Sequence, residues 1–187
     1  MLRLRHLILR LVTSSWSVSR LRYRLHGIRL AGKSTDLLWY FAFGANMHEH
    51  AFIQRRGMRP REWRVGRLKG FRLRFNLEGR PIGKAAPANI APDANDEVWG
   101  VLYLITQAAM LRLDASEGVP GRRYRHLWAE VEDTDGERLT AMTYITEGKE
   151  RDGNPSLRYI TLLREGARAH GLPVHYIRFL ESVKHAE

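Results

Sequence analysis

The first stretch that could carry chemistry is residues 39–47, which read WYFAFGANM. An apolar run there passes directly into small residues and then into a helix-like segment. A strand, a tight turn at Gly44 and a helix N-terminus would leave backbone N–H groups free to hold an anion or a developing oxyanion. Ala45 stands in the middle of the turn, so the turn supplies no nucleophile and any catalysis would come from its backbone. The alternative is an ordinary tight turn in which Asn46 bonds its own backbone.

The second stretch is residues 110–124, which read MLRLDASEGVPGRRY. Met110, Leu113 and Glu117 are spaced i, i+3, i+7, so Glu117 belongs to the apolar stripe of a helix and faces the core or a cavity. Burial and the negative end of the helix dipole both favour the protonated form of such a carboxylate, which suits a general acid–base near neutral pH. The alternative is a partly buried acid paired with Arg122 or Arg123. We expect the neighbouring Asp114 only to organise local hydrogen bonds.

Other side chains offer little chemistry. The chain has no cysteine, which excludes disulfides, thiolate nucleophiles and cysteine-based zinc sites. His48 and His50 are two residues apart, so on a helix they point in different directions and do not share a metal. His170 and His175 flank a Gly-Leu-Pro turn and are expected to serve helix ends. We predict no metal site.

Length and composition predict one soluble, globular domain. A chain of 187 residues with 44% hydrophobic and 10% aromatic residues can bury a sizeable core. No apolar run approaches the roughly 18 residues that a membrane-spanning helix needs, so we expect no membrane partner. The expected domain is residues 37–187.

The net charge of +11 belongs mostly to residues 1–36, which hold seven arginines and Lys33 against the single acid Asp36. Three explanations of this basic extension stay open: a disordered tail, a targeting segment, or a start codon assigned too early. The remaining residues carry 23 basic and 19 acidic groups, so we expect no nucleic-acid partner for the domain. An RNA-binding role of the tail is a competing hypothesis.

The elements that would position both stretches are short and mixed in type. We expect strands at 37–43, 65–76, 97–105, 127–132 and 139–145, with a hairpin turn at 133–136. We expect helices at 47–56, at 107–117 with Thr106 as the N-cap and Gly118 as the stop, from 156 to 170, and at 173–183. Residues 78–95 are rich in Gly, Pro, Ala and Asn and are predicted to form a long loop. Without a regular βαβ alternation, the pattern indicates an α+β fold.

Several ordered motifs together resemble the γ-glutamylcyclotransferase family, also described as AIG2-like. They are residues 40–47, 89–92, 97–101, 113–119, 155–159 and 166–173. The resemblance covers about residues 38–183, and its segment 113–119 is similar to the one that carries the family's catalytic glutamate. It implies a small mixed β-barrel with flanking helices.

The resemblance also implies an unusual reaction. The α-amine of a γ-glutamyl group attacks its own γ-carbonyl, and the products are 5-oxoproline and an amine or amino acid, without water, metal or cofactor. The implied general acid–base is Glu117, and the implied substrate-binding residues are Tyr40, Phe43, Gly44, Ala45, Asn46, Met47, Tyr124 and Tyr159. We expect the amides of residues 44–47 to meet anionic groups of the substrate.

Two departures from the family's Tyr-Gly-Ser-Asn loop bear on the substrate. Ala45 replaces its serine, which leaves the backbone donor in place, and Phe43 replaces its tyrosine, which changes a polar contact. Glutathione is a less expected substrate, because the loop differs from that of glutathione-specific cyclotransferases. The remaining expectations are a small γ-glutamyl substrate, a monomer or homodimer, and a cytoplasmic location. The alternative function is a non-catalytic module that binds a small ligand or a protein on the same fold.

Overall fold

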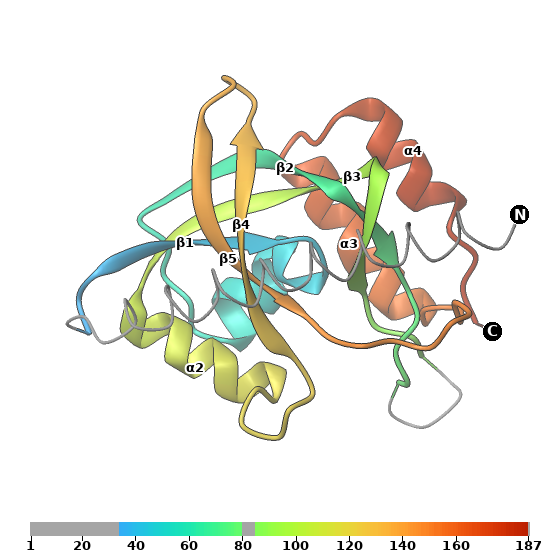
Figure 1. The fold of residues 1–187 in the computed structure, drawn as a ribbon, viewed down its shortest axis with the longest axis horizontal. Coiled ribbons are helices and arrows are strands. Elements are labelled where there is room, and N and C mark those ends of the chain that lie inside the picture. Colours follow the sequence, from blue (N-terminus) through green and yellow to red (C-terminus); the bar gives the residue numbers. More distant parts are fainter. Residues whose placement is uncertain (1–33, 80–84, 187) are drawn as a thin grey trace, which may run out of the picture.

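Five strands close into a small mixed barrel, as the computed structural model shows for residues 34–79 and 85–186 (Figure 1). The order of neighbouring strands around the barrel is β1-β3-β2-β4-β5. All neighbours pair antiparallel except β1 and β5, which close the barrel in parallel. The strands are β1 (Leu37–Ala42), β2 (Glu62–Arg74), β3 (Asn89–Thr106), β4 (Arg125–Asp133) and β5 (Arg138–Ile145). The predicted α+β barrel is thereby confirmed.

The last residues of strand β1 are apolar because they are covered on both faces. Tyr40, Phe41 and Ala42 are buried, and the strand lies between β3 and β5. The ring of Tyr40 stacks on Phe52 at 5.8 Å between centroids. The end of β1, where the loop 43–47 begins, is therefore held firmly by the core.

Strand β3 corrects the second part of the expected loop at 78–95, because residues 89–95 belong to the strand. Its first residues, 89–92, pair with residues 74–71 of β2, and the register shifts between Lys69 and Phe71. Pro92 has no N–H to donate, and it pairs directly beside this irregularity. Pairing with a distant strand thus overrides a local composition that is typical of loops.

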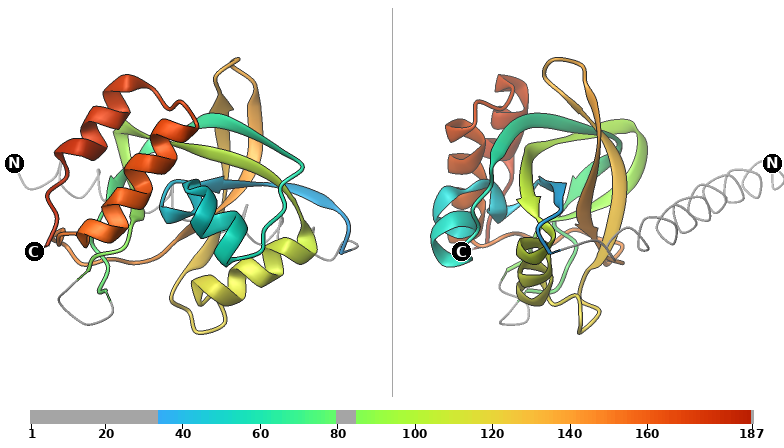
Figure 2. Two further views of the ribbon diagram at one scale, coloured as in Figure 1. Left: turned by 180° about the vertical axis from the view of Figure 1, so that it is seen from behind. Right: turned by 90° about the vertical axis from the view of Figure 1, so that its left-hand side faces the viewer.

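In the described part of the chain, three α-helices flank the barrel: α2 (Gln107–Glu117), α3 (Leu157–Ala169) and α4 (Val174–Ser182). The side chains of Thr106 and Ser156 cap α2 and α3 by accepting hydrogen bonds from backbone amides, which confirms both predicted helix starts. Figures 1 and 2 show α3 and α4 side by side against one side of the barrel, whereas α2 lies apart from them.

The segment expected as a helix at 47–56 takes a different form. It consists of a 3₁₀ turn, η2 (Ala45–Met47), and a π-helix, η3 (His50–Arg55). Met47 and Phe52 are fully buried, and Phe52 stacks on Tyr103 at 4.3 Å between centroids. These buried side chains fix the segment against the barrel.

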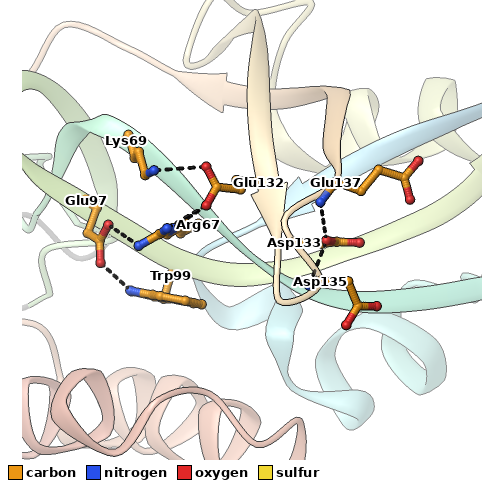
Figure 3. A network of polar contacts seen from close by, with 8 residues as sticks. All are labelled: Arg67, Lys69, Glu97, Trp99, Glu132, Asp133, Asp135 and Glu137. Atoms are coloured by element: carbon orange, nitrogen blue, oxygen red, sulfur yellow. Dashed lines mark hydrogen bonds and ion pairs between the residues drawn. The ribbon is translucent and has the colours of Figure 1, made fainter.

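A polar network stabilises the short contact between β2 and β4, which pair only at Gly66–Asp133 and Arg67–Glu132. Arg67 donates to Glu132 at 2.5 Å, and Lys69 donates to the other oxygen of Glu132 at 2.9 Å (Figure 3). Hydrogen bonds from Arg67 and then Lys69 lower the pKa of Glu132 to about 2. Asp133 accepts the amides of residues 135 and 137, which forms the predicted hairpin turn.

The beginning of the described chain already belongs to the domain. The carbonyls of Ser34 and Asp36 accept hydrogen bonds from the amides of Ala108 and Gln107, at 3.1 and 2.8 Å. The expectations for residues 1–33 lie outside the described residues. In the part of the chain that the structure describes, no helix has the length and apolarity needed to cross a membrane.

Candidate active site

A cavity of about 530 Å³ lies where the loop after β1 meets the C-terminal end of α2. Eight of the nine residues predicted from the sequence line it, namely Tyr40, Phe43, Gly44, Ala45, Asn46, Glu117, Tyr124 and Tyr159. Met47 does not, because its side chain is fully buried in the core. The barrel and the helix therefore bring both sequence stretches to one hollow.

Glu117 is placed at the cavity wall by the end of α2. It is the last residue of the helix, and Gly118 follows in the left-handed conformation with a φ of 75°. The amides of Gly118 and Val119 return to the carbonyls of residues 115 and 114, which closes the helix in the way predicted. The termination fixes the direction in which the Glu117 side chain leaves the helix.

The two oxygens of Glu117 differ in their surroundings. Oε1 accepts a hydrogen bond from Asn46 Nδ2 at 3.1 Å and forms an ion pair with Arg56 at 3.0 Å. Oε2 has no hydrogen-bond partner among the described residues, and it is not buried. One oxygen is thus held by the protein, and the other is available to a bound molecule.

The ion pair of Glu117 bears on the alternative interpretation, in which this acid is only paired with an arginine. The sequence suggested Arg122 or Arg123, which follow Glu117 closely, but the ion pair is formed by a residue at the end of η3. Arg56 also donates to the hydroxyl of Ser116, which in turn donates to the carbonyl of Leu113 at 2.8 Å. These contacts join the loop after β1 to the last turn of α2.

Asn46 links the loop to the carboxylate. Its Nδ2 donates to the hydroxyl of Tyr40 at 2.8 Å as well as to Glu117, so both amide protons are used. The residue is 6% exposed, and its Oδ1 is buried without a partner in the described residues. Asn46 does not bond its own backbone through this group, because its partners are distant side chains.

The backbone of the loop corrects a second expectation. The amide of Met47 donates to the carbonyl of Gly44 at 3.0 Å. This amide is therefore engaged within the protein and does not face a ligand, unlike what was expected for the amides of residues 44–47 as a group. A Cβ on Gly44 would lie 3.1 Å from the Tyr159 oxygen, so the small residue makes room for that hydroxyl.

Tyr124 and Tyr144 direct their protons into the protein. Tyr124 donates to the carbonyl of Ala88 at 2.9 Å. Tyr144 donates at 2.6 Å to Asp114 Oδ1, which also bonds to His126 Nε2 at 2.7 Å. Asp114 thus joins α2 to β4 and β5, over a wider range than the local role expected for it. Both tyrosines shape the cavity wall through these bonds.

The hydroxyls of Tyr40 and Tyr159 differ from these two, because they accept hydrogen bonds from the protein and donate none to it. The oxygen of Tyr40 accepts from Asn46, and that of Tyr159 accepts from the amide of Ala88 at 3.1 Å. Neither hydroxyl has an acceptor for its own proton among the described residues. Burial raises the pKa of Tyr159 to about 12, and burial followed by the charge of Glu117 raises the pKa of Tyr40 still further. Both hydroxyls stay protonated at neutral pH and can donate to an oxygen in the cavity.

Sequence reasoning missed several residues of the lining, among them the polar residues Arg56, Ser116 and Tyr144. Ser116 adjoins the predicted glutamate, so proximity in the chain was a usable signal. Arg56 and Tyr144 carry no local signal, because only the closed barrel brings η3 and β5 to the end of α2. Among the described residues, no group of three histidine or acidic side chains is placed to hold a metal ion.

The chain is similar to known proteins over most of its length. A family model described as AIG2-like family matches residues 97–180. The γ-glutamylcyclotransferase of Bos taurus is 31% identical over 161 residues, which cover 83% of each chain. That of Homo sapiens is 29% identical, again over 83% of each chain. A solved γ-glutamyl cyclotransferase structure matches with a TM-score of 0.71 at 25% identity, over 81% of this chain and 90% of the other. With these relatives and the same barrel fold, the chain belongs to the γ-glutamylcyclotransferase family.

Proposed function

We propose that the chain is a γ-glutamyl cyclotransferase that converts a γ-glutamyl amine or amino acid into 5-oxoproline and the free amine. The observation that carries this proposal is the carboxylate of Glu117, which lines the cavity with Oε1 held by Asn46 and Arg56 and with Oε2 free. The reaction needs one group that accepts a proton and then returns it, and a carboxylate held in this way supplies it.

In the proposed reaction, one bond forms and one bond breaks, and both lie within the substrate. The neutral α-amine attacks the γ-carbonyl carbon, and a new C–N bond closes the five-membered ring. The bond between this carbon and the leaving nitrogen then breaks. Glu117 takes the proton that the attacking nitrogen loses and gives a proton to the leaving nitrogen. No atom is gained or lost, so the ring closure consumes no water.

The cavity supplies the remaining requirements through position and hydrogen bonding. Holding the amine and carbonyl in a reactive geometry can lower the barrier by roughly 7–11 kcal/mol. Negative charge develops on the γ-carbonyl oxygen, and the free protons of Tyr40 and Tyr159 are available to stabilise it. The guanidinium of Arg123 also lines the cavity and can attract the α-carboxylate of the substrate.

The test is release of 5-oxoproline from γ-glutamyl dipeptides and γ-glutamyl amines, with glutathione included. The Glu117→Gln variant keeps the shape of the side chain and removes the base, so its kcat should fall by about 10² to 10⁴. Glu147→Gln is the matched control, because Glu147 is exposed and lies outside the cavity.

Each outcome separates the candidate functions. Release by the wild type and by Glu147→Gln, but not by Glu117→Gln, supports the proposed reaction and the role of the carboxylate. No release by the folded wild type from any compound would favour the binding-module alternative. Equal release by all three proteins would show that Glu117 is not the base.

A further inference from the structure

A single nitrogen of Arg56 contacts two residues at the end of α2. Nη1 lies 3.0 Å from Oε1 of Glu117, with which it forms an ion pair, and it also donates to the hydroxyl of Ser116. The one proton of Ser116 is used on the carbonyl of Leu113, at 2.8 Å, so the Ser116 oxygen remains an acceptor for the guanidinium. The positive charge is therefore anchored beside the carboxylate by the residue that precedes it in the chain.

The other surroundings of Glu117 disfavour its ionised form. Its side chain is 16% exposed, and the residue is the last of α2, where the helix dipole places partial negative charge. Asn46 contributes one hydrogen bond from a neutral donor. A carboxylate that takes the proton of the attacking nitrogen has to be ionised before the reaction begins. The site therefore needs a positive charge close to Glu117.

The remaining ionisable groups around the cavity do not supply this charge. Burial is the main cause that raises the pKa of each lining tyrosine, so all of them stay neutral at neutral pH: Tyr40, Tyr124, Tyr144 and Tyr159. Arg123 lines the cavity, but among the described residues the ion pair with Glu117 belongs to Arg56. Asp114, on the same helix, is bound to Tyr144 and His126. Arg56 is thus the cation that acts on the carboxylate at contact distance.

We infer that Arg56 is a positioning residue that keeps Glu117 ionised in the free enzyme and thereby extends catalysis to more acidic pH. The inference rests on the proposed function, in which Glu117 is the proton acceptor. Arg56 acts through the carboxylate, because it contacts Oε1 and leaves Oε2 to the substrate. Without the guanidinium, Glu117 would take up a proton from solvent at a higher pH and would then be lost as a base.

The first test is the pH dependence of kcat/KM for 5-oxoproline release from γ-glutamyl-alanine, from about pH 4 to 8. Arg56→Gln removes the charge and keeps a polar side chain. Its acid limb should move to higher pH by about one unit, because an opposite charge at contact distance favours an ionised carboxylate by that order. Arg56→Lys retains the charge, so its acid limb should stay close to that of the wild type. The ionisations of the substrate are common to all variants and cancel in the comparison.

Arg112→Gln is the matched control, because it removes the same charge from an exposed position of α2 that does not line the cavity. Its acid limb should coincide with that of the wild type. A purely structural role of Arg56 would lower kcat/KM by the same factor at every pH. An acid limb that Arg56→Gln leaves in place, or that Arg56→Lys moves equally far, would overturn the inference.

A titration without substrate keeps the inference separate from the proposed reaction. Carbon-13 NMR of the glutamate side-chain carboxyls follows Glu117 directly, and the signal that disappears in Glu117→Gln identifies it. If the midpoint is higher in Arg56→Gln than in the wild type, the action of Arg56 on the carboxylate stands even where no 5-oxoproline is released, and only the proposed function fails. If 5-oxoproline is released and the two midpoints agree, the reaction stands and the role of Arg56 is refuted.

Discussion

Asn46 determines how the loop and the glutamate act together. One carboxamide donates both of its protons, to Tyr40 at 2.8 Å and to Glu117 at 3.1 Å. The first contact leaves the Tyr40 proton without a protein acceptor, and the second leaves Oε2 of the carboxylate as the free oxygen. A proton donor and a proton acceptor are thereby set side by side in one cavity, which is what ring closure at a carbonyl requires.

The two departures from the family's loop leave this arrangement in place. Ala45 still lines the cavity, and the contacts of Asn46 with Tyr40 and Glu117 need no side-chain hydroxyl at position 45. Phe43 is 7% exposed and lies near Phe41, at 6.5 Å between ring centroids. Phe43 makes that part of the wall apolar.

Replacing Tyr40 by phenylalanine tests the role of its free proton. We expect kcat/KM to fall by about ten- to a hundred-fold, because one hydrogen bond to the developing charge is lost. The measurement is 5-oxoproline release, together with circular dichroism to verify the fold. Tyr176→Phe is the control, since this buried tyrosine of α4 lies outside the cavity. Wild-type kcat/KM in Tyr40→Phe would exclude the hydroxyl as a donor to the substrate.

Helix α2 is the element that aims the carboxylate. Thr106 caps its start, and Gly118 ends it in the left-handed conformation. Between these ends, Asp114 accepts from Tyr144 on β5 and bonds to His126 on β4. The last turn is thus fixed both along the helix and against the barrel, which limits the positions open to Glu117.

Replacing Gly118 by alanine tests whether the end of α2 positions Glu117. A left-handed alanine costs roughly 1–2 kcal/mol, and the added Cβ would lie 3.2 Å from Cβ of Arg123. We expect lower stability and also a lower kcat/KM per folded molecule, because the neighbouring glutamate shifts. Gly136→Ala is a matched control, since Gly136 has a φ of 84° but nothing within 4 Å of the added Cβ.

Urea unfolding and 5-oxoproline release should then separate the two variants. Both substitutions should lower the free energy of unfolding, whereas only Gly118→Ala should lower activity. Equal activities in the two folded variants would show that the conformation at Gly118 does not position the carboxylate.

Local signals in the sequence were sufficient for some elements and insufficient for others. Capping residues and turn chemistry predicted α2, α3 and the hairpin at 133–136, because those features depend on neighbours in the chain. The first half of β3 was missed, since its strand form depends on pairing with β2. Similarly, Glu117 could be proposed from its helical spacing, whereas its partner Arg56 comes from a segment that only the folded chain brings near.

On the scale of the whole molecule, the closed barrel brings the site residues together. Strand β1 lies between β3 and β5, and the loop at its end meets α2 on one side and α3 on the other. The cavity is walled by buried aromatic rings, so the same residues serve the core and the site. An alkaline pH that ionises the tyrosine hydroxyls on these rings should therefore affect folding and catalysis together.

Five buried tyrosines of the described residues and the half-buried Tyr159 give the folded protein a predictable limit at alkaline pH. Burial is the main cause that raises the pKa of each of Tyr40, Tyr103, Tyr124, Tyr144, Tyr159 and Tyr176. For Tyr159 the pKa rises to about 12. In the unfolded chain a tyrosine releases its proton near pH 10.

We therefore expect the free energy of unfolding to be independent of these groups below pH 10 and to fall as the pH rises above it. Above pH 10 the unfolded chain loses protons that the folded protein keeps, which favours unfolding. Each tyrosine then contributes a loss of about 1.4 kcal/mol at pH 11. The six together approach the 5–15 kcal/mol that stabilises a typical domain, so unfolding should occur near pH 11.

Urea unfolding followed by circular dichroism from pH 7 to 11.5 measures this, and Tyr176→Phe should reduce the slope by about one sixth of the tyrosine contribution. A free energy of unfolding that stays constant to pH 11 would mean that these hydroxyls ionise equally in both states, and the donors assigned to the cavity would then not be sheltered from water.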